Sequence, residues 1–341
     1  MAQLILFYPE GHQEHALRGH PERPERVEAV REGLERAGYW DSAEVLAPLP
    51  ISREVLERIH TPGYLDELQE ASASGRFLDP DTYTTPSSWD LALKAAGGGA
   101  AVAEAVWDGE ETRGFALTRP PGHHAAPDRG MGFCLLNNAA LAAEYLIKEK
   151  GARRLALIDI DLHHGNGTQD IFYQRDDVLY VSLHQSPFYP GTGDFDETGA
   201  GLGEDWTVNL PLPSGSGDQA YRALTREVIL PVLEDRQPEM LLISYGFDAH
   251  PRDPLGGLRL SGAGYHQAVG DLVSWAERAC GGKTAVILEG GYDMTAGRIC
   301  SAGVTAALLG GEWQDPLGGP EGEEADQWKH VLNRAVERWT R

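Results

Sequence analysis

Short apolar runs, rich in β-branched residues, recur along the chain with helix-like stretches between them. This alternation restricts the fold more than any other feature. Consecutive apolar positions mean that both faces of each strand must be covered, as in a parallel sheet between two layers of helices. The runs lie at residues 4–8, 114–122, 154–165, 178–185, 239–250 and 284–293. The sequence therefore predicts an α/β fold with a doubly wound, mostly parallel sheet.

Three stretches between these runs have the apolar periodicity of helices, at residues 137–151, 219–236 and 263–282. Glycine closes the first and the last of them. The Gly/Pro-rich stretch at 309–327 is the strongest break in the pattern, and residues 328–339 after it predict a terminal helix that docks back. Because there is no repeat and no long linker, we interpret residues 1–341 as a single domain.

Composition excludes several classes of protein. No apolar run approaches the roughly 20 residues of a membrane helix, and the first residues do not resemble a secretion signal. The three cysteines, Cys134, Cys280 and Cys300, show no paired spacing, which is typical of the reducing cytoplasm. A formal net charge of −23 argues against nucleic acid as a partner. The same charge favours the approach of a cationic substrate, or serves only solubility.

Four predicted strands end in side chains that bind metals or transfer protons. These ends read PPGHHA (120–125), DIDLHHG (159–165), GFDAH (246–250) and EGGYD (289–293). In open α/β sheets, ligands bind beyond the carboxyl ends of the strands. The four ends therefore predict one active site at a common edge of the sheet.

The segment DIDLHHG contains the first candidate metal ligands. If the extended geometry continues, alternation places Asp159, Asp161 and His163 on one side of the strand and His164 on the other. Asp161 and His163 would then reach a cation beyond the strand, with Asp248 as the third ligand. One histidine and two carboxylates with an open position form a catalytic set that suits zinc. The alternative is that Asp161 and His163 only cap the following helix.

The motifs together resemble the zinc-dependent histone deacetylase family, whose arginase-like α/β fold is shared with acetylpolyamine amidohydrolases and acetoin-utilisation proteins. The similarity covers most of the chain in the family's order, and the GNGTQ and EGGYD forms are closer to class II and bacterial members. It implies a three-layer α/β/α fold with roughly eight strands. The matching motifs are HPERPERV (20–27), RPPGHHA (119–125), GFCLLNN (132–138), DIDLHHGNGTQ (159–169), YPGTG (189–193), GFDAHPRDPLGG (246–257) and LEGGYD (288–293).

The resemblance implies a role for each residue of the catalytic set. Asp161, His163 and Asp248 would bind one zinc ion. His123 and His124 would form a tandem pair beside a metal-activated water, His123 bonded to Asp159 and His124 to Asn166. Because a carboxylate backs one histidine and a neutral amide the other, their pKa values can differ. We expect His124 to be the main base and acid, although the order of the pair stays open.

Further residues are assigned by the same resemblance. Tyr292 would donate its hydroxyl to the developing oxyanion, and some family members with His at this position are poor deacetylases. The implied monovalent cation site, for an ion such as K⁺, consists of Asp159, Asp161, His163, Ser182 and Leu183. The implied substrate channel consists of Gly132, Phe133, Tyr189, Leu255 and Asp81, for the last of which a turn role is an equal alternative. His12, His15 and His20 are expected to be exposed or structural.

Three other functions are alternatives to this interpretation. Two-metal ureohydrolases such as arginase place further carboxylates where this chain has Gly165 and His250, so one metal is favoured. Acetylpolyamine-specific members of class II carry a Glu gatekeeper where this chain has Leu255, which favours acyl-lysine in proteins or peptides over N-acetylated polyamines. Bacterial polyamine enzymes select differently, so they stay an alternative. A non-catalytic binder would lack a ligand, a tandem histidine or the tyrosine. Iron(II) in place of zinc and a homo-oligomer stay open.

Overall fold

The computed structural model describes residues 2–109, 112–320 and 322–340. In this part of the chain, eight strands form one sheet in the order β2-β1-β3-β8-β7-β4-β5-β6, and every neighbouring pair is parallel. The predicted α/β class and eight-stranded sheet are confirmed. The strands are β1 (Gln3–Phe7), β2 (Glu44–Leu46), β3 (Thr112–Ala116), β4 (Leu155–Asp159), β5 (Val178–Gln185), β6 (Thr207–Leu212), β7 (Leu241–Tyr245) and β8 (Thr284–Leu288).

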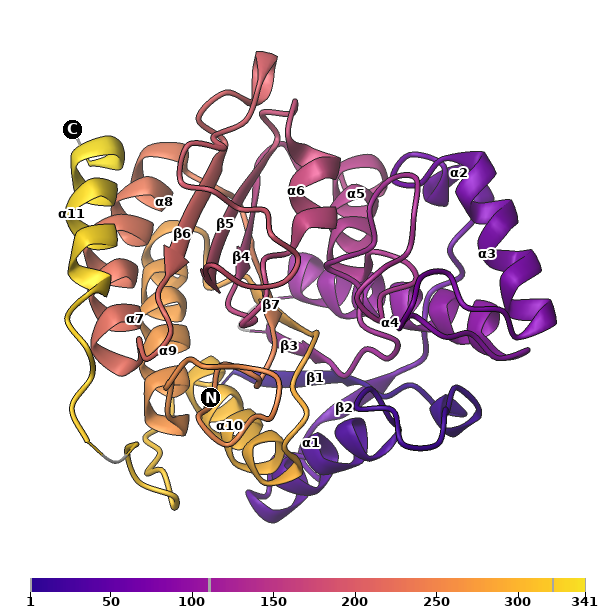
Figure 1. Cartoon of the computed structure of the whole chain (residues 1–341), viewed down its shortest axis with the longest axis horizontal. Helices are drawn as coiled ribbons and strands as arrows, with labels where there is room; N and C mark the ends of the chain where they lie inside the picture. The colour runs from indigo at the N-terminus through magenta and orange to yellow at the C-terminus, as the bar shows by residue number, and fades with distance from the viewer. Residues whose placement is uncertain (1, 110–111, 321, 341) are drawn as a thin grey trace.

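Helices cover both faces of this sheet, as Figure 1 shows. Strand residues alternate between two apolar cores: Leu155 and Leu157 of β4 belong to one, Ala156 and Ile158 to the other. Such burial on both faces explains the continuous apolar runs of the sequence. The helices are α1 (Glu25–Arg36), α2 (Arg53–Leu56), α3 (Pro62–Ser74), α4 (Ser88–Asp108), α5 (Asn138–Glu149), α6 (Asn166–Phe172), α7 (Asp218–Leu224), α8 (Leu230–Arg236), α9 (Gly262–Ala279), α10 (Met294–Leu308) and α11 (Trp328–Trp339).

The two strands that the sequence did not predict form the two edges of the sheet. Strand β2 has only three residues, none of them buried. Strand β6 contains Pro211, a residue that sheets accept at their edges because it cannot donate a ladder hydrogen bond. Neither segment carries the long apolar run that marks a central strand.

Four predicted strand segments end earlier than expected. β3 ends at Ala116, β4 at Asp159, β7 at Tyr245 and β8 at Leu288. Asp161 and His163 therefore follow the strand in a loop and do not continue its extended geometry. The loops after these strands carry most of the reactive side chains. Because the backbone of a loop is not held in an extended conformation, these side chains can point toward one place.

The remaining elements agree with the helical patterns. The stretch 219–236 is helical, with a π-helical segment at Thr225–Ile229 shortly before Pro231, which cannot donate an intrahelical hydrogen bond. The terminal helix α11 exists and buries Trp328 and Ala335 against the core. Among the described residues, none of the helices has the length and apolar character needed to cross a membrane.

Candidate active site

The reactive strand ends meet because β3, β8, β7 and β4 are consecutive neighbours in the middle of the sheet. A pocket of about 840 Å³ opens at their carboxyl edge. His124, His163 and Tyr292, from three different loops, line this pocket. The reactive strand ends therefore lie together at one edge of the sheet, as inferred from the sequence.

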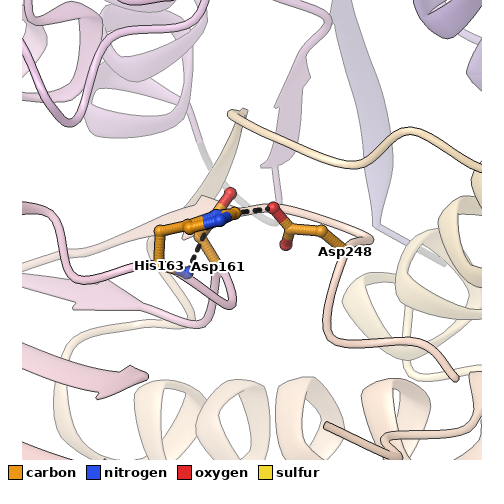
Figure 2. A group of neighbouring side chains, drawn as sticks. All are labelled: Asp161, His163 and Asp248. Atoms are coloured by element: carbon orange, nitrogen blue, oxygen red, sulfur yellow. Dashed lines mark hydrogen bonds and ion pairs between the residues drawn. The ribbon is translucent and has the colours of Figure 1, made fainter. Parts of the chain in front are cut away.

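Asp161, His163 and Asp248 form a compact buried triad (Figure 2). His163 Nδ1 lies 3.2 Å from Asp161 Oδ1 and 3.1 Å from Asp248 Oδ2. The second oxygen of each carboxylate accepts a main-chain N–H group, from Gly290 at 2.8 Å and from Leu162 at 2.9 Å. These bonds turn the remaining oxygen of each carboxylate toward the imidazole. One nitrogen and two oxygens within 4.8 Å of one another fit a single metal ion such as zinc.

The electrostatics of the triad favour a cation. Burial alone would lower the pKa of His163, but its hydrogen bonds and attraction to Asp161 and Asp248 raise that pKa to about 9. Burial raises the pKa of Asp248, and the nearby carboxylate of Asp161 adds to the rise. Two carboxylates in a buried place are stable only when positive charge compensates them.

The tandem histidines have different partners. His123 Nδ1 lies 3.0 Å from Asp159 Oδ2, and His124 Nδ1 lies 2.8 Å from Asn166 Oδ1. Burial would lower the pKa of His123, but attraction to Asp161 and Asp159 raises it to about 10. Burial, with repulsion from His123 and His163, holds the pKa of His124 well below its usual value. His124 is therefore the neutral member of the pair, and it is also the member that lines the pocket.

A residue not selected from the sequence holds the tandem histidines in place. The buried side chain of Glu289 accepts the N–H groups of Gly122 at 2.7 Å and His123 at 3.0 Å. Burial raises the pKa of Glu289 to about 7. Glu289 stands directly after an apolar run, as Asp159 does. That position is the sequence feature that could have indicated a role for Glu289 in the site.

Tyr292 lines the pocket with 9% of its surface exposed. Its ring packs edge-to-face on Phe133, with 5.8 Å between centroids, and the Arg26 guanidinium lies over the ring, 5.0 Å from its centroid. The preceding Gly291 has φ of +108°, and a Cβ there would lie 2.3 Å from the Phe247 ring. Only glycine allows this approach of the backbone.

All five predicted channel residues lie on the wall of the pocket: Gly132, Phe133, Tyr189, Leu255 and Asp81. At Gly132 φ is +55°, and a Cβ would lie 2.5 Å from the His124 ring, so glycine keeps this wall clear. The wall also contains residues that the sequence did not indicate, including His20, Gln185, Phe188 and Ser214. His20 packs against Phe133 with 4.7 Å between ring centroids, and its place in HPERPERV was the available signal.

Comparison with known proteins agrees with this geometry. Residues 20–308 match the histone deacetylase domain. The chain belongs to the histone deacetylase family. It is 41% identical to a probable deacetylase of Archaeoglobus fulgidus, over 91% of this chain and 87% of the relative. It is 37% identical to a histone deacetylase-like amidohydrolase of Pseudomonas aeruginosa, over 89% of this chain and 80% of the relative.

A solved structure supports the same assignment. The crystal structure of the HDA15 HD domain superposes with a TM-score of 0.87 at 36% identity, covering 99% of this chain and 96% of that one. The arginase-like fold expected from the motifs is thereby confirmed. As a member of this family, the chain is a hydrolytic deacetylase that acts on an acetylated substrate.

Gly165 and His250, the two positions compared with two-metal ureohydrolases, lie outside the metal-binding group of the described residues. A Cβ at Gly165 would lie 2.3 Å from Asp159 Oδ2, so no side chain fits there. His250 is buried in a turn, where its Nδ1 accepts the N–H of Arg252 at 3.2 Å. Across residues 2–109, 112–320 and 322–340, the triad is the one His/Cys/Asp/Glu group with metal-binding spacing.

Proposed function

We propose that this histone deacetylase family member is a zinc-dependent deacylase that hydrolyses the amide of Nε-acetyl-lysine, or another Nε-acyl-lysine, in proteins or peptides. The observation that carries the proposal is the convergence of His124, His163 and Tyr292 on one pocket. A base, a metal ligand and a hydroxyl donor facing the same space are the parts that amide hydrolysis needs.

Asp161, His163 and Asp248 would hold the zinc ion, since their three donor atoms are buried and close together. When bound there, zinc would polarise the amide carbonyl and lower the pKa of a water molecule. The family is zinc-dependent in general, which supports zinc over other divalent metals.

His124 would take the proton of the attacking water and then deliver it to the departing amine. Two properties support this role: its place on the pocket wall and the lowered pKa that leaves it neutral near pH 7. His123, hydrogen-bonded to Asp159, would keep its proton and stabilise negative charge that develops nearby.

Tyr292 would donate its hydroxyl to the developing oxyanion, a contribution of about 3 kcal/mol for such a donor. Burial raises its pKa well above the usual value, so the phenol keeps its proton. Its contacts with Phe133 and Arg26 restrict the ring before substrate binds.

The pocket wall supports an unbranched acyl-lysine side chain as substrate. Phe133 and Tyr189 are aromatic walls, and the half-buried, apolar Leu255 also lines the pocket. Leu255 has no charge to offer a distal ammonium group. An N-acetylated polyamine is the second candidate, because Asp81 also lines the pocket and the chain carries a net charge of −23.

We also propose a monovalent cation site, for K⁺, at Asp159, Asp161, His163, Ser182 and Leu183. Asp159 and Ser182 are paired neighbours of β4 and β5, which supports the assignment. Ser182 Oγ lies 3.0 Å from His184 Nδ1, so its hydroxyl already has one partner.

The test is hydrolysis of an acetyl-lysine peptide and of N-acetylputrescine by the zinc-loaded protein, side by side, with Tyr292→Phe as control. We expect peptide turnover that falls about 100-fold in the variant. Preference for N-acetylputrescine would identify N-acetylated polyamines as the substrate class. If neither compound is cleaved, acetyl-lysine is contradicted as the substrate, and peptides with longer acyl groups are tested next.

A further inference from the structure

We propose that Asp253 is a positioning residue for Tyr292: its carboxylate fixes the main chain of the tyrosine and ties it to the pocket wall that carries Leu255. This inference rests on the proposed role of Tyr292 as oxyanion donor.

Three main-chain N–H groups converge on the Asp253 carboxylate. Oδ2 accepts from Tyr292 at 2.6 Å and from Asp293 at 3.2 Å, and Oδ1 accepts from Leu255 at 2.9 Å. Asp253 itself is only 6% exposed. It follows β7, whereas Tyr292 follows β8, so one side chain joins the loops of two neighbouring parallel strands.

The peptide group between Gly291 and Tyr292 is held at both ends. Its carbonyl oxygen accepts from Arg26 Nε at 2.5 Å, and its N–H donates to Asp253. Two glycines precede Tyr292, and glycine restrains the backbone less than any other residue. The orientation of the tyrosine therefore depends on these two contacts more than on local backbone preference.

A carboxylate suits this position better than any other side chain. It accepts on both oxygens and donates nothing, so it can serve all three N–H groups. An asparagine would turn its NH₂ group toward at least one of these donors. Burial and repulsion from Asp248 raise the pKa of Asp253 to about 7, and the three N–H groups oppose that rise. A buried acid so close to a metal ligand is unfavourable unless such contacts compensate it.

The experiment is a double-mutant cycle of Asp253→Asn and Tyr292→Phe in the zinc-loaded protein with the acetyl-lysine peptide. We expect Asp253→Asn alone to lower kcat roughly 10- to 100-fold, because a small misplacement of a catalytic group has effects of this size. KM should change less. In the Tyr292→Phe background the same substitution should lower kcat by less than about threefold, since there is no hydroxyl left to position.

Two controls accompany the cycle. Asp293→Asn changes the neighbouring acid but preserves a good N-cap for α10, whose first N–H groups Asp293 accepts at 3.0 and 2.8 Å. Its kcat should stay within about twofold of the parent, as for a surface change. Bound zinc and the melting temperature are measured for every variant, and Asp253→Ser replaces Asp253→Asn if the latter does not fold.

The outcomes separate the two proposals. Equal losses of kcat in both backgrounds, an unchanged kcat in the Asp253 variant, or loss of bound zinc from that variant would overturn the positioning role. If Tyr292→Phe itself retains full kcat, the proposed role of Tyr292 is what fails.

Discussion

The floor and the mouth of the pocket are built differently. At the floor, His124 and His163 line the pocket, and their partners His123 and Asp248 lie behind them. All four are at most 9% exposed, and each side chain has a hydrogen-bonding partner. At the mouth, Phe188 and Tyr189 are 38% and 40% exposed and belong to a loop. Buried groups in surroundings of low dielectric constant have strong electrostatic interactions and are held in place by them, whereas exposed side chains are weakly restrained.

This difference separates reactivity from selectivity. Changes at the floor should abolish turnover of every substrate, because they act on the charges and donors that all amides need. Changes at the mouth should alter which substrate is preferred and leave the chemical step intact.

The largest effect is expected from the triad. Asp161→Asn removes one negative ligand, and the loss of metal-derived stabilisation, several kcal/mol, predicts a fall in kcat/KM of at least roughly 10³-fold. Bound zinc measured alongside activity checks the cause. A fully active variant without zinc would show that the triad does not support the reaction.

The next effect is expected from His124. His124→Ala should retain zinc and lower kcat on the order of 10²- to 10³-fold, the usual contribution of a general base. His123→Ala is the matched comparison, because that residue does not line the pocket. A larger loss of kcat in His123→Ala than in His124→Ala, at equal zinc content, would identify His123 as the general base.

Behind the floor, Glu22 is predicted to stabilise the fold. It is fully buried and bonded to Arg119 at 2.7 Å and to Arg26 at 3.1 Å. Glu22→Gln breaks this buried ion-pair network, so the free energy of unfolding should fall by about 3–5 kcal/mol. Urea denaturation at pH 7 measures the change, and an unchanged midpoint would contradict it.

The same residue gives a pH dependence with a definite sign. Burial alone would raise the pKa of Glu22, but attraction to Arg119, His15 and Arg26 lowers it from 4.5 to about 2. The unfolded chain therefore binds the proton first as the pH falls. The contribution of the ionised Glu22 side chain to the free energy of unfolding is complete above pH 4.5 and is lost as the pH falls toward 2. The difference in unfolding free energy between wild type and Glu22→Gln should therefore shrink across this window.

The smallest effect on turnover is expected at the mouth. Leu255→Glu should keep kcat for the acetyl-lysine peptide within about threefold and improve kcat/KM for N-acetylputrescine about tenfold, as one added ion pair permits. Leu202→Glu is the control, since Leu202 is 75% exposed and does not line the pocket. Equal changes of kcat/KM in the two variants would show that Leu255 does not determine which substrate the pocket prefers.

The sequence by itself determined the central strands and the chemistry at their ends. Apolar runs on both faces indicated a covered parallel sheet, and the acids and histidines behind them marked its active edge. Asp161, His163 and Asp248 were predicted as metal ligands in this way, because their residue types and positions both pointed to a metal, and the structure brings the three side chains together. The edge strands β2 and β6 were missed because an edge does not need a long apolar run.

Only the tertiary structure decided which groups hold the proposed catalytic residues in place. Arg26 contacts Gly291 across 265 positions of the chain, and Asp253 contacts Tyr292 across 39. Glu289 reaches back to His123 across 166 positions. These bonds join side chains to main-chain N–H and C=O groups, which every residue carries, so residue types and spacing cannot reveal them. The order of the strands in the sheet brings the partners together.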